Sequence, residues 1–419
     1  MVEERSDDTT GIERRKELHP GGMPAEARRP RGQTPQENGN GMEVKPGYKQ
    51  TEVGVIPKDW DAEKLGDFVA LQRGHDLTWR DRRRGDVPVM GSAGQNGFHD
   101  MALAQGPGVL LGRSGASFGQ AHYCEKDFWP HNTALYVTDF RGNDPLFVFY
   151  FFKAIDFTRH NSGGAQQSLN RNFIYPIPVG VPHPPEQRAI AGALSDVDAL
   201  LGALDQLIAK KRDLKQAAMQ QLLTGQTRLP GFHGEWQIKR LGTLLRFQVG
   251  FPFSSAFFNE KGEGIRLVKN RDLKSDDQVF HFSGKYDDAF VVHDGDVLVG
   301  MDGDFLPSRW SKGFALLNQR VGRIVPNAGL DSTFSYYLLI EPLKEIEIVT
   351  SSTTVKHLSH GDIEGIECPM PELPEQTAIA EVLTDMDAEL AALEQRRAKT
   401  RALKQGMMQE LLTGRIRLV

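Results

Sequence analysis

Two stretches of the chain carry apolar residues at alternating spacings of four and three over their first halves, the pattern of a helix that packs along a coiled-coil seam. The stretches begin at Pro185 and Pro374 and run for about 38 residues without a proline, which predicts helices on the order of 57 Å long. The apolar residues expected in the seam are Ile190, Leu194, Leu201, Leu204 and Leu214 in the first stretch, and Ile379, Leu383, Leu390, Leu393 and Leu403 in the second.

The residues at both ends of each stretch fit the ends of a helix. Proline is tolerated in a first turn because its missing N–H would have no partner there, and Glu186 and Glu375 suit the positive N-terminal end. Gly225 and Gly414 can adopt the left-handed conformation that closes a helix. The pattern therefore predicts two helices that start and stop at equivalent places.

The two helices are copies of one module. Residues 185–229 align with residues 374–418 without a gap, and 28 of the 45 positions are identical. A lone helix of this length, with a charged outer face, needs a partner for its apolar stripe. We therefore expect the two copies to pair with each other, antiparallel, rather than to be two unrelated core helices that merely look alike.

The segments that precede the helices, residues 48–183 and 230–372, have a different pattern of apolar and polar residues. Short apolar runs such as residues 109–111 and 297–299 alternate with glycine-rich turns, which is typical of strand-dominated domains. The predicted fold is α+β: two strand-rich mixed domains separated by a pair of long antiparallel coiled-coil helices, residues 184–229 and 373–419, with pseudo-twofold symmetry.

Composition narrows the class of protein. The formal net charge of -5 argues against non-specific coating of nucleic acid but leaves room for local basic faces. Two cysteines are too few for a disulfide framework, which favours a reducing cytoplasm, and the longest apolar run, residues 146–152, is too short to span a membrane. Residues 1–41 have almost no large apolar residue and are expected to be a disordered extension, with Met42 close to the natural start.

The order and duplication of these motifs resemble one known family. Pro-Glu-Gln-x-Ala-Ile-Ala opens each helix, Leu-Leu-Thr-Gly closes it, and residues 47–60 read Gly-Tyr-Lys-x-Thr-Glu-x-Gly-x-Ile-Pro-x-x-Trp. This arrangement, over residues 42–419, is similar to the specificity subunits of type I restriction–modification systems. The resemblance implies that the two strand-rich domains are target-recognition domains, each of which reads one half of a split site in double-stranded DNA. It also implies that the helices set the gap between the half-sites and dock two methyltransferase subunits, through which restriction subunits join.

Motifs for catalysis are missing from the sequence. There is no G-x-x-x-x-G-K-[ST] phosphate loop and no cysteine–histidine cluster with zinc spacing. The expected protein is a non-catalytic DNA reader that itself binds no cofactor, while its partner subunits would use S-adenosylmethionine, ATP and magnesium. Two alternatives stay open: the targeting subunit of a related type II enzyme, and a helical scaffold with two protein-binding domains.

Several basic or polar runs are candidates for DNA contact. Arginine suits phosphate clamping and guanine readout, and amide or hydroxyl side chains read base edges. The same runs could instead be solvated loops or tight turns. The candidates are Arg73, Arg80, Arg82, Arg83, Arg84, Ser92, Arg113, Ser114, Gln167 and Ser168 in the first domain, and Lys269, Asn270, Arg271, Thr353, Thr354 and Lys356 in the second.

Overall fold

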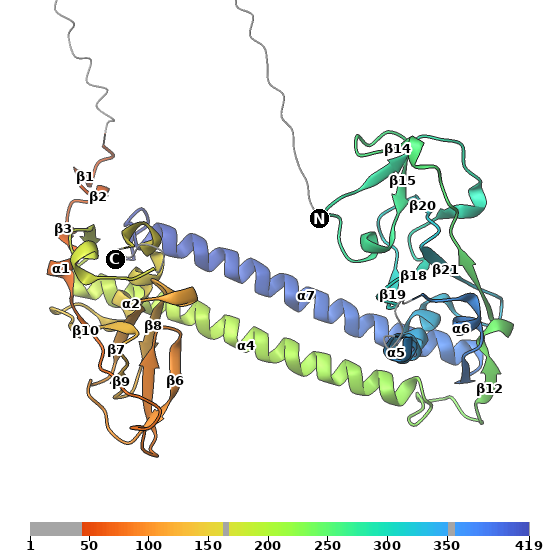
Figure 1. Cartoon of the computed structure of the whole chain (residues 1–419), viewed down its shortest axis with the longest axis horizontal. Helices are drawn as coiled ribbons and strands as arrows, with labels where there is room; N and C mark the ends of the chain where they lie inside the picture. The colour runs from red at the N-terminus through yellow and green to blue at the C-terminus, as the bar shows by residue number, and fades with distance from the viewer. Residues whose placement is uncertain (1–43, 162–166, 351–356, 419) are drawn as a thin grey trace, which may run out of the picture. The chain divides into compact units, whose positions relative to one another are not determined.

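The computed structural model describes residues 44–161, 167–350 and 357–418. It has the predicted α+β fold, in which two strand-rich domains alternate along the chain with two long helices (Figure 1). The extension expected at residues 1–41 and the candidates Thr353, Thr354 and Lys356 lie outside the described residues. No described helix is both long enough and apolar enough to cross a membrane.

The two long helices are α4 (Pro184–Leu222) and α7 (Leu373–Leu411), each 39 residues long with a proline in its first turn. Ion pairs join Asp198 to Lys404 and Lys215 to Asp387 across the two helices. Since the residue numbers rise along one helix and fall along the other, the helices are antiparallel (Figure 1). The predicted pairing of the two repeats is confirmed.

The seam between the helices keeps its four-and-three spacing along their whole length. Beyond Leu204, which is 4% exposed, it continues through the buried Ile208 and then through Lys215, a charged residue. The placement of Leu214 and Leu403 in the seam is wrong, because their side chains are 46% and 60% exposed. The heptad repeat puts the following residue, a lysine in both helices, at the seam position instead. Three further seam candidates differ in burial: Leu390 is buried, and Leu201 and Leu393 are half-buried.

The first half of each apolar stripe packs into a domain as well as toward the partner helix. Ile190 and Leu194 belong to the core of the first domain together with Leu411 from the far end of α7. In the same way, Ile379 and Leu383 share the core of the second domain with the end of α4. Each domain is therefore anchored on the start of one long helix and the end of the other.

The first domain contains eleven described strands and three short α-helices. Its elements are β1 (Tyr48–Thr51), β2 (Gly54–Pro57), β3 (Asp61–Lys64), α1 (Leu65–Phe68), β4 (Ala70–Arg73), β5 (Val87–Gly91), β6 (Gly94–His99), β7 (Gly108–Gly112), β8 (Ala121–Cys124), β9 (Trp129–Pro130), β10 (Ala134–Asp139), α2 (Pro145–Ala154), α3 (Arg171–Ile174) and β11 (Pro178–Val181). An antiparallel sheet in the order β4-β10-β7-β8 forms its centre, and α2 packs on β7 and β8.

The second domain repeats this plan with a larger second sheet. Its elements are β12 (Gln237–Arg240), β13 (Leu245–Val249), β14 (Phe258–Asn259), β15 (Ile265–Val268), β16 (Phe280–Phe282), β17 (Val291–Val292), β18 (Val297–Gly300), β19 (Pro307–Arg309), β20 (Ala315–Leu317), β21 (Val321–Pro326), α5 (Ser332–Thr350), α6 (His360–Glu364) and β22 (Glu367–Met370). The order β13-β21-β18-β19 matches that of the first domain, and α5 packs on it. A five-stranded sheet, β14-β16-β15-β20-β17, takes the place of the three-stranded β6-β5-β9 sheet.

Candidate nucleic-acid interface

The loop between β4 and β5, residues 74–86, carries the sharpest basic cluster of the first domain. Trp79 is 79% exposed, and the guanidinium of Arg80 lies 5.4 Å from the centre of its ring. Arg84 is also exposed. An exposed tryptophan beside arginines can stack on a base or a sugar while the cations contact phosphate.

Two arginines of the same loop form contacts with other residues of the domain. Arg82 donates from Nη1 to the carbonyl oxygen of Asn96 at 2.7 Å and from Nη2 to the Asn96 side chain at 3.0 Å. Arg83 pairs with Asp100 at 2.9 Å. Both side chains thus hold the loop against β6 and the residues that follow it. The Arg82 guanidinium thus has a structural role within the domain, and its contact with DNA stays a prediction.

A polar pocket of about 510 Å³ lies at the end of β4. Its wall includes Arg73, Asp76 and Arg113, with the Arg73 and Asp76 side chains 4.0 Å apart. Arg113 donates to the Asn132 carbonyl at 3.0 Å, and burial, together with the nearby charge of Arg73, lowers the pKa of Arg113. The Asn132 amide in turn donates to Asp76. The pocket thus brings together the donors of Arg73 and Arg113 and the acceptor Asp76, a combination that reading of base edges requires.

Backbone pairing brings the other first-domain candidates to the same region. The amide of Leu169 donates to the carbonyl of Arg113 at 2.8 Å, which places Gln167 and Ser168 beside the pocket. The Ser92 hydroxyl donates to the carbonyl of Ser114 at 2.9 Å. Ser92 and Ser114 therefore join the loops after β5 and β7 to each other, and the Ser92 hydroxyl already has a partner within the domain.

In the second domain, Lys269 and Arg271 share an aromatic platform. The Lys269 ammonium lies 3.3 Å from the centre of the Phe280 ring, and the Arg271 guanidinium lies 5.2 Å from it. Burial and the nearby charge of Arg271 lower the pKa of Lys269. Asp272, which is buried, accepts from the Lys269 amide at 2.7 Å and fixes the turn that presents both cations.

Asn270 does not join this pair. Its side-chain amide donates to the carbonyl of Asp302, and its oxygen lies against Gly300, where any Cβ would collide with it. Asn270 therefore braces the end of β18, and its reading of base edges stays a prediction. The residue lies inward because glycine leaves room for its side chain.

Sequence reasoning missed an ionic cluster at the end of β18. Asp302 lies 3.4 Å from Arg320 and 3.1 Å from His357. The cluster occupies the place that the polar pocket has in the first domain, since Leu358 donates to the Met301 carbonyl as Leu169 does to Arg113. The equivalence of Leu169 and Leu358 in the repeat was the signal that could have located it.

Sequence reasoning also missed the polar joints between the domains and the helices. Trp60 donates to Glu186 at 2.9 Å, and Arg417, near the end of the chain, pairs with the same carboxylate at 2.6 Å. In the second copy Trp236 and Arg228 pair with Glu375 at 3.1 and 2.5 Å. These residues occupy equivalent positions of the sequence repeat. Their identity in the two copies is the signal from which the contacts could have been predicted.

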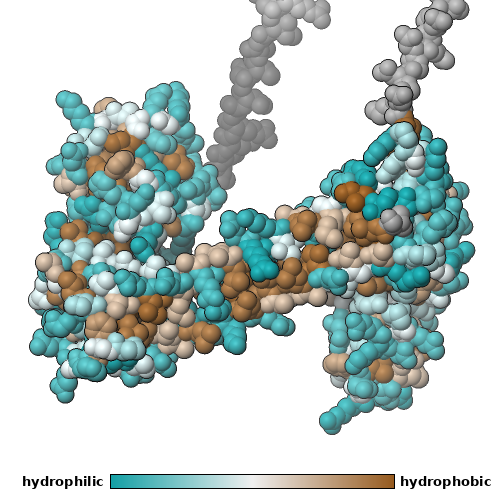
Figure 2. All heavy atoms as spheres, turned by 180° about the vertical axis from the view of Figure 1, so that it is seen from behind, coloured by the Kyte–Doolittle hydropathy of each residue, from teal (hydrophilic) through white to brown (hydrophobic). Residues whose placement is uncertain are grey.

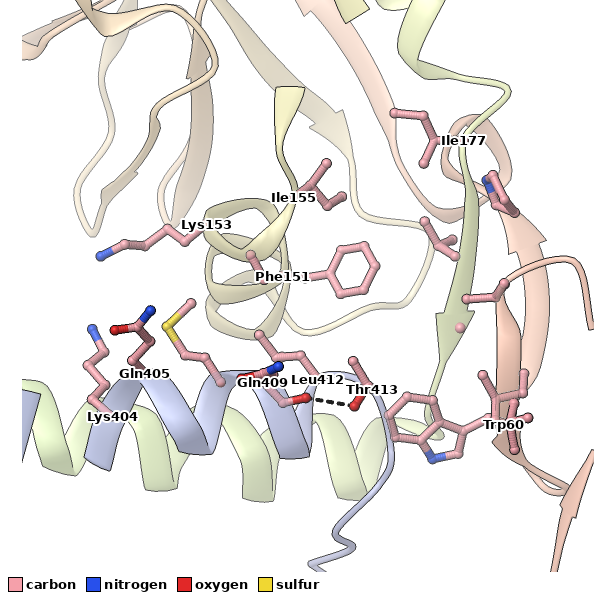
Figure 3. A pocket seen from close by; sticks show the side chains of 18 of the residues that line it. Trp60, Phe151, Lys153, Ile155, Ile177, Lys404, Gln405, Gln409, Leu412 and Thr413 are labelled. Carbon is pink, nitrogen blue, oxygen red and sulfur yellow. Dashed lines mark hydrogen bonds between the residues drawn. The ribbon is translucent and has the colours of Figure 1, made fainter. Parts of the chain in front are cut away.

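A groove of about 780 Å³ lies between the first domain and the C-terminal part of α7 (Figure 3). Phe151, Ile155 and Leu412 give it an apolar wall, and Lys153 and Lys404 lie at one end (Figure 3). Hydrophobic side chains also reach the surface along the helix pair (Figure 2). The most exposed leucines of the two helices are Leu200, Leu207, Leu214, Leu373 and Leu403.

Among residues 44–161, 167–350 and 357–418, no group of three histidine, cysteine, aspartate or glutamate side chains is placed to hold a metal ion. The pocket at the end of β4 combines arginine and amide side chains with His75 and Asp76, groups that can bind phosphate and base edges.

Comparison with known proteins identifies the family. A family model described as "Type I restriction modification DNA specificity domain" matches residues 57–210 and 233–401, well over half of the chain. The type I restriction enzyme EcoBI specificity subunit of Escherichia coli is 34% identical over 193 residues, which cover 45% of this chain and 41% of that relative. The putative type I restriction enzyme MjaX specificity subunit of Methanocaldococcus jannaschii is 23% identical over 88% of this chain and 97% of its own length.

Solved structures agree on the fold. The S subunit of a type I restriction-modification system from M. genitalium superposes with a TM-score of 0.59 at 16% identity, covering 84% of this chain and 96% of that one. A chain from a structure of type I R-M complex assembly gives a TM-score of 0.53 over 86% of this chain and 99% of its own. The chain therefore belongs to the family of type I restriction–modification DNA specificity subunits.

Proposed function

We propose that this protein reads a bipartite DNA sequence, one half-site with each strand-rich domain, and binds no cofactor and catalyses no reaction itself. The observation that carries the proposal is the contrast between the two halves of the molecule. The domains are anchored on the helix pair by equivalent residues, Glu186 and Glu375, yet they carry different polar surfaces. A protein that recognises two different half-sites needs two domains that attach to the helices in the same way but present different surfaces to DNA.

The proposed DNA contacts are the exposed side chains of the loops and pockets. In the first domain they are Trp79, Arg80, Arg84 and the pocket lined by Arg73 and Arg113. In the second domain they are Lys269 and Arg271 on the Phe280 ring, and Arg320. Arginine and lysine here would supply both phosphate contacts and guanine readout.

The helix pair would serve as the spacer and as the platform for partners. Half-sites that are read from one face of a duplex must be separated by a fixed number of base pairs, which a rigid helix pair can hold. Exposed leucines such as Leu207 and Leu403, and the groove beside α7, offer apolar surface for docking two methyltransferase subunits, with restriction subunits joining through them. Those partners would bring S-adenosylmethionine, ATP and magnesium.

Methylated-motif sequencing tests the proposal. The chain is expressed in a methylation-free host together with type I methyltransferase subunits that assemble with it, and the modified adenines are mapped. A motif of two specific half-sites with a constant gap is the expected result. No motif, combined with binding to DNA that does not weaken as salt rises, would favour a protein-binding scaffold, because phosphate contacts make affinity depend steeply on salt.

A further inference from the structure

A three-residue joint connects the first domain to both long helices. The Tyr150 hydroxyl, on α2 of the domain, donates to Asp198 of α4 at 2.8 Å. Lys404 of α7 donates to both oxygens of the same carboxylate, at 2.5 and 2.7 Å. The Lys404 ammonium also lies 5.2 Å from the centre of the Tyr150 ring. One carboxylate thus links three elements that are far apart in the sequence.

The second domain has the same joint. Tyr337 of α5 donates to Asp387 of α7 at 2.7 Å, and Lys215 of α4 pairs with that carboxylate at 2.5 Å. The Lys215 ammonium lies 5.5 Å from the centre of the Tyr337 ring. Asp387 and Lys215 are the repeat equivalents of Asp198 and Lys404, although the two domains differ in sequence. The two tyrosines, contributed by dissimilar domains, nevertheless meet these carboxylates in the same way.

The lysines stand at seam positions, where an apolar residue would normally pack. Their side chains are only 18% and 11% exposed. A charge in such a place costs free energy unless it is paired, and replacing a buried ion pair with apolar residues is often neutral or stabilising. The best-attested use of a polar group in a coiled-coil core is to fix the register of the helices.

Charge pairing between the helices is not enough by itself to fix their register. If one helix slid by a heptad, about 10 Å, Lys404 would face Asp205 and Lys215 would face Glu394, both acidic. In that register, however, the tyrosines could not reach the carboxylates that the lysines contact. Burial, followed by the hydrogen bond to Asp198, raises the pKa of Tyr150, so its hydroxyl keeps the proton that it donates.

From this geometry we infer that Tyr150 and Tyr337 are positioning residues that set the permitted gap between the two half-sites. Each tyrosine locks its reading domain to a lysine–aspartate pair that spans the helices, so domain orientation and helix register are fixed together. A change of one base pair in the gap displaces a half-site by about 3.4 Å and turns it about the duplex axis by roughly a tenth of a turn. A domain held by both helices cannot follow that movement. The inference rests on the proposed function.

The test measures gap tolerance in the complex with its methyltransferase subunits. Duplexes carry the native half-sites at the native gap and at gaps one base pair shorter and longer. Tyr150→Phe with Tyr337→Phe removes two hydroxyls and leaves both ion pairs in place, so the variant should fold. We expect methylation at the altered gaps, relative to the native gap, to rise about tenfold, because a hydrogen bond to a charged group is worth at least that factor. The half-site sequences should not change.

A matched control removes a contact between the helices that touches no domain. Arg212 of α4 pairs with Glu394 of α7, and both side chains are largely exposed. Arg212→Gln should leave the gap preference unaltered. Asp198→Asn with Asp387→Asn should broaden the gap preference as the tyrosine variant does.

Two results would overturn the inference, and they differ from each other. A lower melting temperature with an unchanged gap preference would show that the joints only stabilise the fold. If the wild-type complex methylates all gaps equally, or recognises a single undivided site, the proposed function itself fails.

Discussion

At the scale of single residues, the 74–86 loop offers two exposed cations, Arg80, which lies over the Trp79 ring, and Arg84. We expect Arg80→Gln with Arg84→Gln to weaken binding to every DNA sequence and to reduce the dependence on salt. Each lost phosphate contact should lower the slope of log affinity against log salt by about 0.9. Fluorescence anisotropy with a specific and an unrelated duplex, over a series of salt concentrations, measures both quantities.

Arg141→Gln is the matched control for that experiment. Arg141 lies in the turn after β10, next to the strand end where Asp139 pairs with Ala70. The 74–86 loop leaves β4 at the opposite end, where Arg73 pairs with Leu135. A loss confined to one base position would instead mean that the loop arginines read guanine. Equal losses for the control and the double variant would contradict the assignment of this loop.

The ion pair between Asp59 and Arg417, beside the contact of Arg417 with Glu186, makes the stability of the protein depend on pH. Its hydrogen bonds to Arg417 hold the pKa of the Asp59 carboxyl below its usual range. A depressed pKa in the folded state contributes stability that is present above the unfolded pKa, about 4, and is lost as pH falls through the folded value. Asp59→Asn should therefore lower the melting temperature near neutral pH. The difference from wild type should shrink in acid, and a constant difference across the whole range would refute the linkage.

Residue types alone could not separate contacts within a domain from surface available to DNA. Arg82 and Arg84 are two positions apart in one basic run, yet Arg82 is held by Asn96 while Arg84 is exposed. Asn270 resembles a base reader in sequence but fills the space above Gly300. Such partners come from strands that only the folded sheet brings together.

At the scale of elements, the helix pair depends on its apolar seam. Leu204 is 4% exposed and Leu214, on the same helix, is 46% exposed. Leu204→Asp should lower the free energy of unfolding by about 3 kcal/mol or more, because it removes a buried leucine and places a charge in the seam. Leu214→Asp, the same substitution on the exposed face, should change it by no more than about 0.5 kcal/mol.

Urea unfolding of the two variants beside the wild type measures this difference. If Leu214→Asp is as damaging as Leu204→Asp, the seam has been assigned to the wrong face of α4. Adding Leu393→Asp to Leu204→Asp should prevent helix pairing, and assembly with methyltransferase subunits should then fail.

The long helices were the most predictable elements. The proline starts, the glycine stops and the repeat placed both, and their mutual pairing followed from the need to cover the stripe. The prediction went wrong only where the seam becomes polar. Lys215 and Lys404 keep the heptad spacing, but the hydrophobic pattern points to the leucine one position earlier in each helix, Leu214 and Leu403, and both are exposed. The strands of the domains have little periodicity, and their sheet order was not predictable.

At the scale of the whole molecule, we expect the chain to recognise DNA without catalysing a reaction itself. The purified protein, free of partners, should show no methyltransferase, nuclease or ATPase activity above background. Assays with radiolabelled S-adenosylmethionine, supercoiled plasmid and ATP test the three activities. Methyl transfer to DNA by the isolated chain, persisting through further purification, would contradict the proposal.

The central claim is that each domain reads its own half-site. Its most direct measurement is a domain exchange, in which residues 48–183 are replaced by the equivalent domain of another type I specificity subunit and the methylated motif is sequenced in cells. We predict that one half of the motif changes to that of the donor, while the other half and the gap stay as they were. A motif in which both halves change together, or in which neither changes, would contradict the account.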